Sequence, residues 1–263
     1  MVKFDKSIIG MIHLDPMPGT ALYKSSFKDI LKKALKEAEI YKKCGIDMVA
    51  IENMHDTPYL NRTVGPEITA GMAVIGYKIK QKISLPCGIQ ILAGANKEAL
   101  ACALSADLDF IRAEGFVFSH IADEGLMNSC AGELLRYRKL LEACDIAILT
   151  DIKKKHSSHS ITQDTDIAET AKAAEFFRAD GVIVTGTATG TKADIEELKS
   201  VKKSVNIPVL VGSGVDIKNV DNYLKLADGL IVGSWFKYDG KWENDIDPDR
   251  VSEFMKKVNV LRK

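Results

Sequence analysis

The sequence predicts an α/β protein in which all 263 residues form a single (β/α)8 barrel of the TIM type. Short apolar runs recur along the chain with helix-length segments between them, and strict alternation of strand and helix implies a parallel sheet. The chain length is close to that of one such barrel. The last two runs each end in a Gly-Ser turn, which is where these barrels usually bind phosphate. The predicted strands are 8–14, 48–51, 88–92, 110–113, 146–150, 182–185, 209–211 and 230–232.

An open, doubly wound sheet also fits the alternation. The number of runs and the position of the two Gly-Ser turns favour the closed barrel instead. No Gly-x-Gly-x-x-Gly follows the first run, so the best marker of a dinucleotide-binding sheet is missing. No Pro-rich or Ser-rich linker divides the chain, and we therefore expect residues 1–263 to be one domain.

Helical periodicity and boundary residues support the helices between the strands. Ile30, Ala34 and Ala38 share one apolar face, which leaves the neighbouring lysines to solvent. Asp194 and Asp216 are predicted to cap the sixth and seventh helices, and Pro248 to lie in the first turn of the last one. Three glycines stand where a left-handed C-cap favours glycine: Gly45, Gly181 and Gly229.

Composition excludes several classes of protein. The chain is 46% hydrophobic and 27% charged, and its 36 basic residues balance 36 acidic ones, so no net charge attracts nucleic acid or an anionic membrane. No run approaches the roughly 20 apolar residues of a membrane span, and the start of the chain has no signal-peptide pattern, which predicts a cytoplasmic protein. Five cysteines without a close pair argue against a disulfide framework and a structural zinc site. The sequence leaves open whether the chain forms a homo-oligomer.

The long irregular segments all follow a predicted strand and precede a helix. They cover residues 15–27, 54–66, 116–128 and 153–162. This position places them together at the carboxyl end of the barrel strands, where (β/α)8 barrels keep their chemistry. We therefore expect the functional face at that end.

Polar side chains at the strand ends are predicted to form a ring in the barrel mouth. Side chains alternate across a strand, so apolar residues that suit the helix layer send their neighbours toward the axis. In the second strand, for example, Val49 and Ile51 face the helices and Glu52 faces inward. The ring consists of His13, Asp15, Glu52, Gln90, Arg112, Glu114, Asp151, Lys153, Thr185 and, further along its loop, Lys155.

The predicted ring offers several kinds of chemistry. Its carboxylates are candidates for a general base or for ligands of a divalent metal, and His13 adds a nitrogen donor. Lys153 or Lys155 can serve as a Schiff-base amine or proton shuttle. Structural ion pairs are the alternative, with Arg112 bound to a glutamate and Asp151 to Lys153. Burying so many charges in a barrel mouth is costly without a ligand, and this cost favours a functional ring over purely structural ion pairs. The metal candidates are Asp15, Glu52, Asp151 and His156.

The two Gly-Ser turns are predicted to bind the phosphate of a small molecule. Successive free backbone N–H groups in such turns form an anion-binding nest, although tight strand-to-helix geometry alone also accounts for one turn. Two such turns, each after one of the last two strands, favour a phosphate-binding role. The predicted phosphate site comprises Thr185, Gly186, Gly212, Ser213, Gly214, Gly233 and Ser234, with Thr187, Thr189 and Gly190 beside it.

Two motifs carry a resemblance to a known family. Residues 10–19 read Gly-Met-Ile-His-Leu-Asp-Pro-Met-Pro-Gly, and residues 51–59 read Ile-Glu-Asn-Met-His-Asp-Thr-Pro-Tyr. With residues 65–72, Asp151, Lys155-His156 and the Gly-Ser turns, they resemble the BtpA/SgcQ family over essentially the whole chain. The resemblance implies a phosphate-binding (β/α)8 barrel. The family patterns would cover His13, Asp15, Glu52, Asn53, Asp56, Asp151, Lys155 and His156.

The resemblance also frames the functional alternatives. Many relatives are expected to have histidine where this chain has Lys153, which puts a metal site here in doubt. Family members are linked to photosystem I accumulation in cyanobacteria and to a sugar-handling gene cluster in enteric bacteria. Neither link defines a reaction. The carboxylate-rich ring facing the two phosphate turns predicts an enzyme that acts on a phosphorylated sugar or nucleoside-like metabolite, with carboxylate-based acid/base chemistry ranked above Schiff-base lysis. The alternative is a non-catalytic assembly or regulatory factor.

Overall fold

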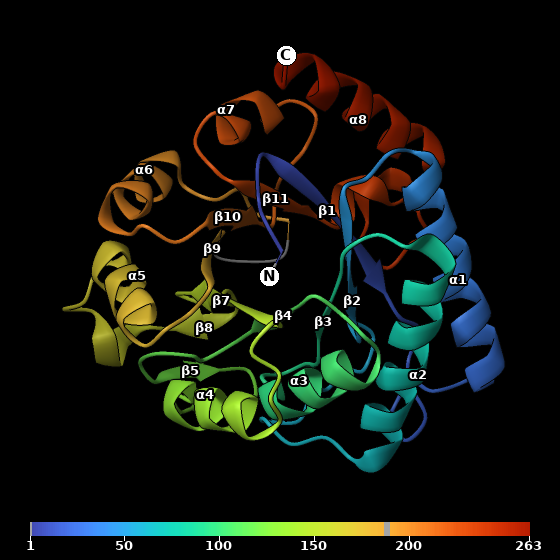
Figure 1. The fold of residues 1–263 in the computed structure, drawn as a ribbon, viewed down its shortest axis with the longest axis horizontal. Coiled ribbons are helices and arrows are strands. Elements are labelled where there is room, and N and C mark those ends of the chain that lie inside the picture. The colour runs from blue at the N-terminus through green and yellow to red at the C-terminus, as the bar shows by residue number, and fades with distance from the viewer. Residues whose placement is uncertain (1, 187–189) are drawn as a thin grey trace.

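The computed structural model describes residues 2–186 and 190–263. Within these residues, eight parallel strands close into a barrel in the order β1-β11-β10-β9-β7-β4-β3-β2, and the helices surround it (Figure 1). The barrel strands are β1 (Ser7–His13), β2 (Met48–Glu52), β3 (Cys87–Gln90), β4 (Phe110–Ala113), β7 (Ala147–Ile152), β9 (Gly181–Thr185), β10 (Val209–Gly212) and β11 (Gly229–Val232). The helices are α1 (Phe27–Lys43), α2 (Pro66–Ile83), α3 (Asn96–Ser105), α4 (Ala131–Leu140), α5 (Ile167–Phe176), α6 (Ile195–Ser204), α7 (Val220–Leu224) and α8 (Pro248–Leu261).

The predicted (β/α)8 barrel is confirmed, and each predicted strand coincides with a barrel strand. The register brings polar strand ends side by side, because His13 lies opposite Glu52 and Glu52 opposite Gln90. On the other side of the barrel, Thr185 lies opposite Gly212. Residues far apart in the chain therefore meet at the carboxyl end of the strands.

The predicted alternation of side chains is confirmed by two separate apolar cores. One core lies between the strands and the helices and includes Val49 and Ile51. The other fills the barrel interior, and Val2 and Phe4 pack against it. Figure 1 shows the amino terminus lying across one end of the barrel. The interior core consists of Ile9, Met11, Met48, Ala50, Phe110, Ala147, Leu149, Ile183, Leu210 and Ile231.

A small second sheet, which the sequence did not predict, forms from the segments that follow β4 and β7. Its strands are β5 (His120–Ala122), β6 (Gly125–Met127) and β8 (Ser157–Ser158), in the antiparallel order β6-β5-β8. They arise from two segments predicted to be irregular, and Figure 1 shows β5 and β8 beside the barrel near α4 and α5. Short 3-10 turns follow at η1 (Ser160–Thr162), η2 (Ser234–Phe236) and η3 (Tyr238–Gly240).

The predicted helix boundaries are partly confirmed. The Asp194 carboxylate accepts hydrogen bonds from the first-turn amides of α6, and Pro248 begins α8. Asp216 does not cap α7: it binds the amides of residues 218 and 219 in the preceding turn, and α7 begins only at Val220. Gly45 adopts a φ of +79° after α1, as predicted.

Gly181 and Gly229 are not C-caps, because they are the first residues of β9 and β11. Close packing explains glycine at Gly181, where a Cβ atom would lie 2.8 Å from the Leu149 side chain. Within the described residues, every helix is too short or too polar to span a membrane.

Candidate functional site

A pocket of about 290 Å³ opens at the carboxyl end of the barrel strands. It brings part of the predicted polar ring together with the two predicted phosphate turns, although the turns lie far along the chain from the first strands. Its inner wall is formed by side chains at the ends of β1, β2 and β4, and its outer wall by the segments after β10 and β11. The predicted residues that line it are His13, Glu52, Arg112, Lys155, Ser213, Gly214, Gly233 and Ser234.

The turn after β10 requires an unusual backbone. Ser213 and Gly214 both have left-handed φ angles, of +71° and +63°. A Cβ atom on Gly214 would lie 2.4 Å from the Thr191 carbonyl oxygen, so no other residue fits without displacing that segment. The Ser213 hydroxyl accepts a hydrogen bond from the Gly190 amide at 3.0 Å, which joins the turn to the end of the β9 loop.

Three of the predicted phosphate residues lie behind this wall rather than in it. Thr185 is buried, and its hydroxyl has no hydrogen-bond partner among the described residues. Gly186 packs so closely on residue 191 that a Cβ atom would lie 2.1 Å from its carbonyl oxygen. Gly212 leaves room for Arg112, whose Nη2 atom would be 3.7 Å from an added Cβ atom. Thr187 and Thr189 lie outside the described residues.

His13 and Glu52 form a pair in the inner wall. The Nε2 atom of His13 lies 3.5 Å from a Glu52 carboxylate oxygen, and Nδ1 lies 3.3 Å from the Trp242 carbonyl oxygen. A carbonyl oxygen only accepts hydrogen bonds, so we infer that Nδ1 carries the proton and Nε2 presents a lone pair. Burial, and then the charge of Lys237, lower the pKa of His13 well below its ordinary value. His13 is therefore a neutral imidazole at neutral pH.

Arg112 and Asp151 are bound to each other. The Nε and Nη2 atoms of Arg112 donate to the two Asp151 oxygens at 2.9 and 2.8 Å, and the side chains are only 6% and 0% exposed. Burial opposes the charge on Arg112, but Asp151 outweighs it and raises the pKa of the guanidinium. The carboxylate of Asp151 thus fixes Arg112, which lines the pocket.

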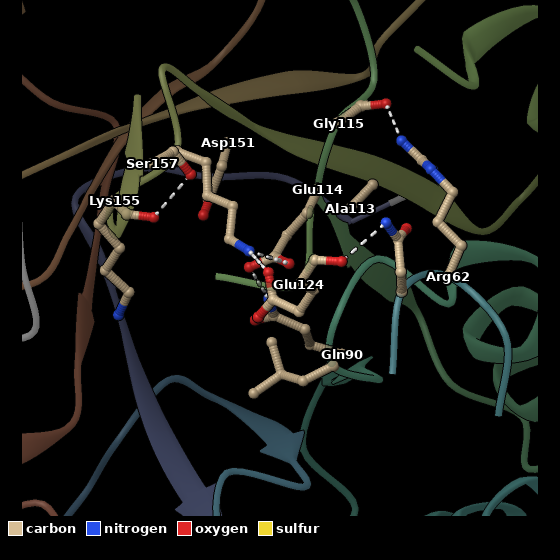
Figure 2. Close-up of polar contacts among 12 residues, drawn as sticks. Arg62, Gln90, Ala113, Glu114, Gly115, Glu124, Asp151, Lys155 and Ser157 are labelled. Carbon is tan, nitrogen blue, oxygen red and sulfur yellow. Dashed lines mark hydrogen bonds and ion pairs between the residues drawn. The ribbon is translucent and has the colours of Figure 1, made fainter. Parts of the chain in front are cut away.

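Glu114 lies in the mouth but does not line the pocket, contrary to the predicted ring. It accepts a hydrogen bond from the Gln90 amide at 3.1 Å and pairs with Lys154 at 3.3 Å. Lys154 also contacts Glu124 at 3.2 Å, so a buried cluster forms near the small sheet (Figure 2). Burial raises the pKa of Glu114. The prediction missed this cluster because its cation follows β7 and Glu124 lies between β5 and β6.

Asp15 and Lys153 point elsewhere. The Lys33 amine on α1 donates to Asp15 at 2.6 Å, and the Lys153 amine donates to the Thr165 carbonyl at 2.6 Å. Neither residue lines the mouth pocket. Asp15 lies two residues beyond the end of β1, and Lys153 has a φ of +51°, so strand alternation no longer decides where their side chains go.

The four predicted metal ligands do not form a site. Asp15 is bound to Lys33 and Asp151 to Arg112, while His156 is exposed and outside the pocket. Across residues 2–186 and 190–263, no three His, Cys, Asp or Glu side chains are grouped so that they could hold a metal ion. The donor groups present in the mouth therefore do not fit a divalent cation.

Two further features complete the wall of the pocket: Arg250, which sequence reasoning missed, and a cluster of aromatic residues that follows β11. The guanidinium of Arg250 stacks 3.8 Å above the Trp235 ring and donates to the Trp235 carbonyl at 2.6 Å, and both residues line the pocket. Trp242 packs on His13 and on His55, with ring centroids 6.4 and 4.9 Å apart. The clustering of aromatic residues was the signal for this wall. No sequence signal pointed to Arg250, because this residue reaches the pocket from α8.

Solved structures with the same architecture support the barrel. Orotidine 5'-monophosphate decarboxylase from Methanocaldococcus jannaschii, complexed with the inhibitor BMP, has a TM-score of 0.61 and 15% identity, and the match covers 97% of this chain and 99% of that one. Thiamine phosphate pyrophosphorylase from Pyrococcus furiosus has a TM-score of 0.60 and 15% identity, with 97% and 96% covered. At this identity the likeness shows the fold alone.

Sequence relatives settle the family. A Caenorhabditis elegans protein described as uncharacterized and mitochondrial is 52% identical over 97% of this chain and 94% of its own length. The photosystem I biogenesis protein BtpA of Synechocystis is 34% identical, with 94% and 86% covered. The location of the first relative concerns that protein, and the cytoplasmic location of this chain stays a prediction. The BtpA family model matches residues 4–260, and the chain therefore belongs to the BtpA family.

Proposed function

We propose that the chain is an enzyme that acts on a small phosphorylated metabolite, a sugar or nucleoside-like compound, in the barrel mouth. One observation carries the proposal: a single pocket is lined by both Gly-Ser turns and by His13, Glu52 and Arg112. An anionic group held at the turns would leave the rest of the ligand against the polar strand ends. Holding a substrate next to a base in this way lowers the entropic part of the barrier.

The size and charge of the pocket support this substrate class. About 290 Å³ is at the small end of ligand pockets, which suits a compact metabolite better than a dinucleotide. Backbone amides of the turns can hold a phosphate by charge-assisted hydrogen bonds, and the guanidinium groups of Arg112 and Arg250 line the same pocket. The two barrels compared above are named for orotidine monophosphate and thiamine phosphate, which agrees with a phosphorylated ligand.

The inner wall supports proton-transfer chemistry. The lone pair on His13 Nε2 can accept a proton from the substrate, and Glu52 at 3.5 Å stabilises the imidazolium that results. The hydrogen bond to the Trp242 carbonyl fixes the ring and its tautomer. Asp151 acts indirectly, because it positions Arg112. Glu52 is thus the one predicted carboxylate that the structure leaves in the pocket.

Binding measurements on substituted turns test the proposal. Ser213→Leu and Ser234→Leu place bulk where the phosphate would lie, so calorimetry with ribose 5-phosphate and with inorganic phosphate should show at least a tenfold loss of affinity for each. The matched control is Ser160→Leu, because Ser160 is exposed and outside the pocket. Phosphate binding that survives both turn substitutions contradicts the proposal.

A non-catalytic assembly role is the second candidate, and the name of the Synechocystis relative favours it. It predicts that Glu52→Ala and His13→Gln leave cellular function intact, since neither side chain is on the outer surface. The enzyme proposal predicts loss of function from both. Complementation of a deletion strain with these variants, at matched protein levels, separates the two candidates.

A further inference from the structure

We propose that Lys155 forms a Schiff base with the substrate, and hence that the substrate is a small phosphorylated aldehyde or ketone. The inference deepens the proposed function and rests on it. It assigns a covalent role to one lysine, and the acid/base pair of His13 and Glu52 would transfer protons during that covalent step. The structural argument concerns where three consecutive lysines go after β7.

The three lysines that follow β7 have different surroundings. Lys153 donates to the Thr165 carbonyl, and Lys154 is buried between Glu114 and Glu124. Lys155 lines the mouth pocket. Left-handed φ angles at residues 153 and 156 turn the chain on both sides of Lys154 and Lys155. This backbone separates side chains that are adjacent in sequence.

Lys155 is the lysine whose amine is available. Among residues 2–186 and 190–263, its Nζ atom has no hydrogen bond and no ion pair, whereas the Lys154 amine has two carboxylate partners. Figure 2 shows the Lys155 side chain extending away from Glu114 and Glu124. The Ser157 hydroxyl donates to the Lys155 carbonyl at 3.2 Å, and β8 begins at Ser157. The small sheet thus holds the backbone from which this amine extends.

The surroundings also favour the neutral, nucleophilic form of the amine. Burial, and then the charge of Arg112, lower the pKa of Lys155, although Glu52 opposes them. Lys154 shows the contrast, since its two glutamates outweigh burial and raise its pKa. An amine without a fixed partner and with a depressed pKa is the kind that attacks carbonyl groups.

The step needs only groups that are in the pocket and water. The lone pair of Nζ forms a bond to the carbonyl carbon, and the carbonyl electrons move to oxygen. His13 Nε2 accepts a proton from the nitrogen and returns it to that oxygen, which gives a carbinolamine. A solvent proton then allows the hydroxyl group to leave as water while the nitrogen lone pair forms the C=N bond. The products are a protonated imine and one water molecule.

The fate of the other charged groups explains why this chemistry fits better than carboxylate catalysis alone. Asp15, Asp151 and Glu114 are each bound to a cation, namely Lys33, Arg112 and Lys154. Of the predicted catalytic residues, the pocket retains an imidazole, one carboxylate, one paired guanidinium and one unpaired amine. An imine on that amine withdraws electrons from the adjacent carbon, so a weak base such as neutral His13 suffices for the following proton transfer.

Borohydride trapping on the full-length protein tests the inference. The protein is incubated with dihydroxyacetone phosphate or pyridoxal 5'-phosphate, reduced with borohydride, digested and analysed by mass spectrometry. We expect one dominant adduct, on the peptide that contains Lys155, and at least a tenfold reduction of that adduct by excess inorganic phosphate. Lys155→Arg should lose the adduct while Lys153→Arg, the matched control, keeps it.

The possible outcomes separate this inference from the proposed function. Inorganic phosphate that binds to the wild type without any trapped adduct overturns the role of Lys155 and leaves the phosphorylated-metabolite proposal intact. Equal labelling of many lysines, or labelling that persists in Lys155→Arg, also overturns it. An adduct on Lys155 that forms equally with unphosphorylated dihydroxyacetone, in a protein that binds no phosphate, overturns the phosphorylated class and with it the inference as stated.

Discussion

Asp151→Asn should destabilise the protein strongly, because it leaves the Arg112 charge buried without its counter-ion. The pair makes two hydrogen bonds, at 2.9 and 2.8 Å, and the two side chains are 6% and 0% exposed. Removing one partner of such a buried pair typically costs about 3–5 kcal/mol. Glu52 and Glu114 also act on Arg112, so we expect the lower half of that range.

Urea unfolding followed by circular dichroism measures this loss in the free energy of unfolding. For a domain of this size, 1 kcal/mol corresponds to about 2–4 °C in Tm, so Tm should fall by roughly 6–16 °C. The matched control is Glu196→Gln, which breaks the exposed ion pair between Glu196 and Lys199 on α6. Such surface pairs contribute at most about 1 kcal/mol.

A double-mutant cycle distinguishes the ion pair from a general defect at position 151. Arg112→Met removes the buried charge, so Asp151→Asn should cost far less in that background than in the wild type. We expect a coupling energy above about 2 kcal/mol between the two positions. A loss below about 1 kcal/mol for Asp151→Asn, or strictly additive effects, would show that the carboxylate does not hold Arg112.

Three further predictions concern two buried charged or titratable side chains and one strained glycine. Glu37→Gln should cost about 3 kcal/mol in urea unfolding, since Lys237, at 3.1 Å from Glu37, is 1% exposed and would lose its counter-charge. Burial lowers the pKa of His120 from 6.5 to about 4. Below pH 6.5 the unfolded chain therefore binds a proton that the folded chain does not, and the free energy of unfolding falls by up to about 3 kcal/mol between pH 6.5 and pH 4. The variant His120→Gln should flatten that decline when unfolding is measured as a function of pH. Gly214→Ala should cost more than about 1 kcal/mol and lower phosphate affinity in calorimetry, because of its φ of +63° and the close Thr191 carbonyl.

Residues within strands could be predicted from the sequence because their geometry is regular. Alternation placed His13, Glu52, Arg112 and Asp151 on the inner side, and all four are buried there. The Gly-Ser turns were predictable for a related reason, since a short strand followed by glycine marks where the chain leaves the barrel. The meeting of these elements in one pocket then followed from closure of the barrel.

Residues beyond the strand ends could not be placed in the same way. Glu114 directly follows β4, yet its partner Lys154 comes from the segment after β7. The sequence does not indicate which of the neighbouring cationic side chains will pair with Glu114. The small sheet has the same origin, because β5 pairs with a two-residue strand about 36 positions later. Two-residue strands carry too little alternation to be recognised.

The glycines of the two turns link the phosphate site to the polar ring in physical terms. A Cβ atom on Gly233 would lie 3.2 Å from the His13 ring, and one on Gly212 would lie 3.7 Å from the Arg112 guanidinium. Both positions therefore provide space for the ring. A side chain at either position would crowd the inward groups that, under the proposed function, meet the substrate. The absence of side chains at the ends of β10 and β11 thus allows polar groups from β1 and β4 to reach a ligand held there.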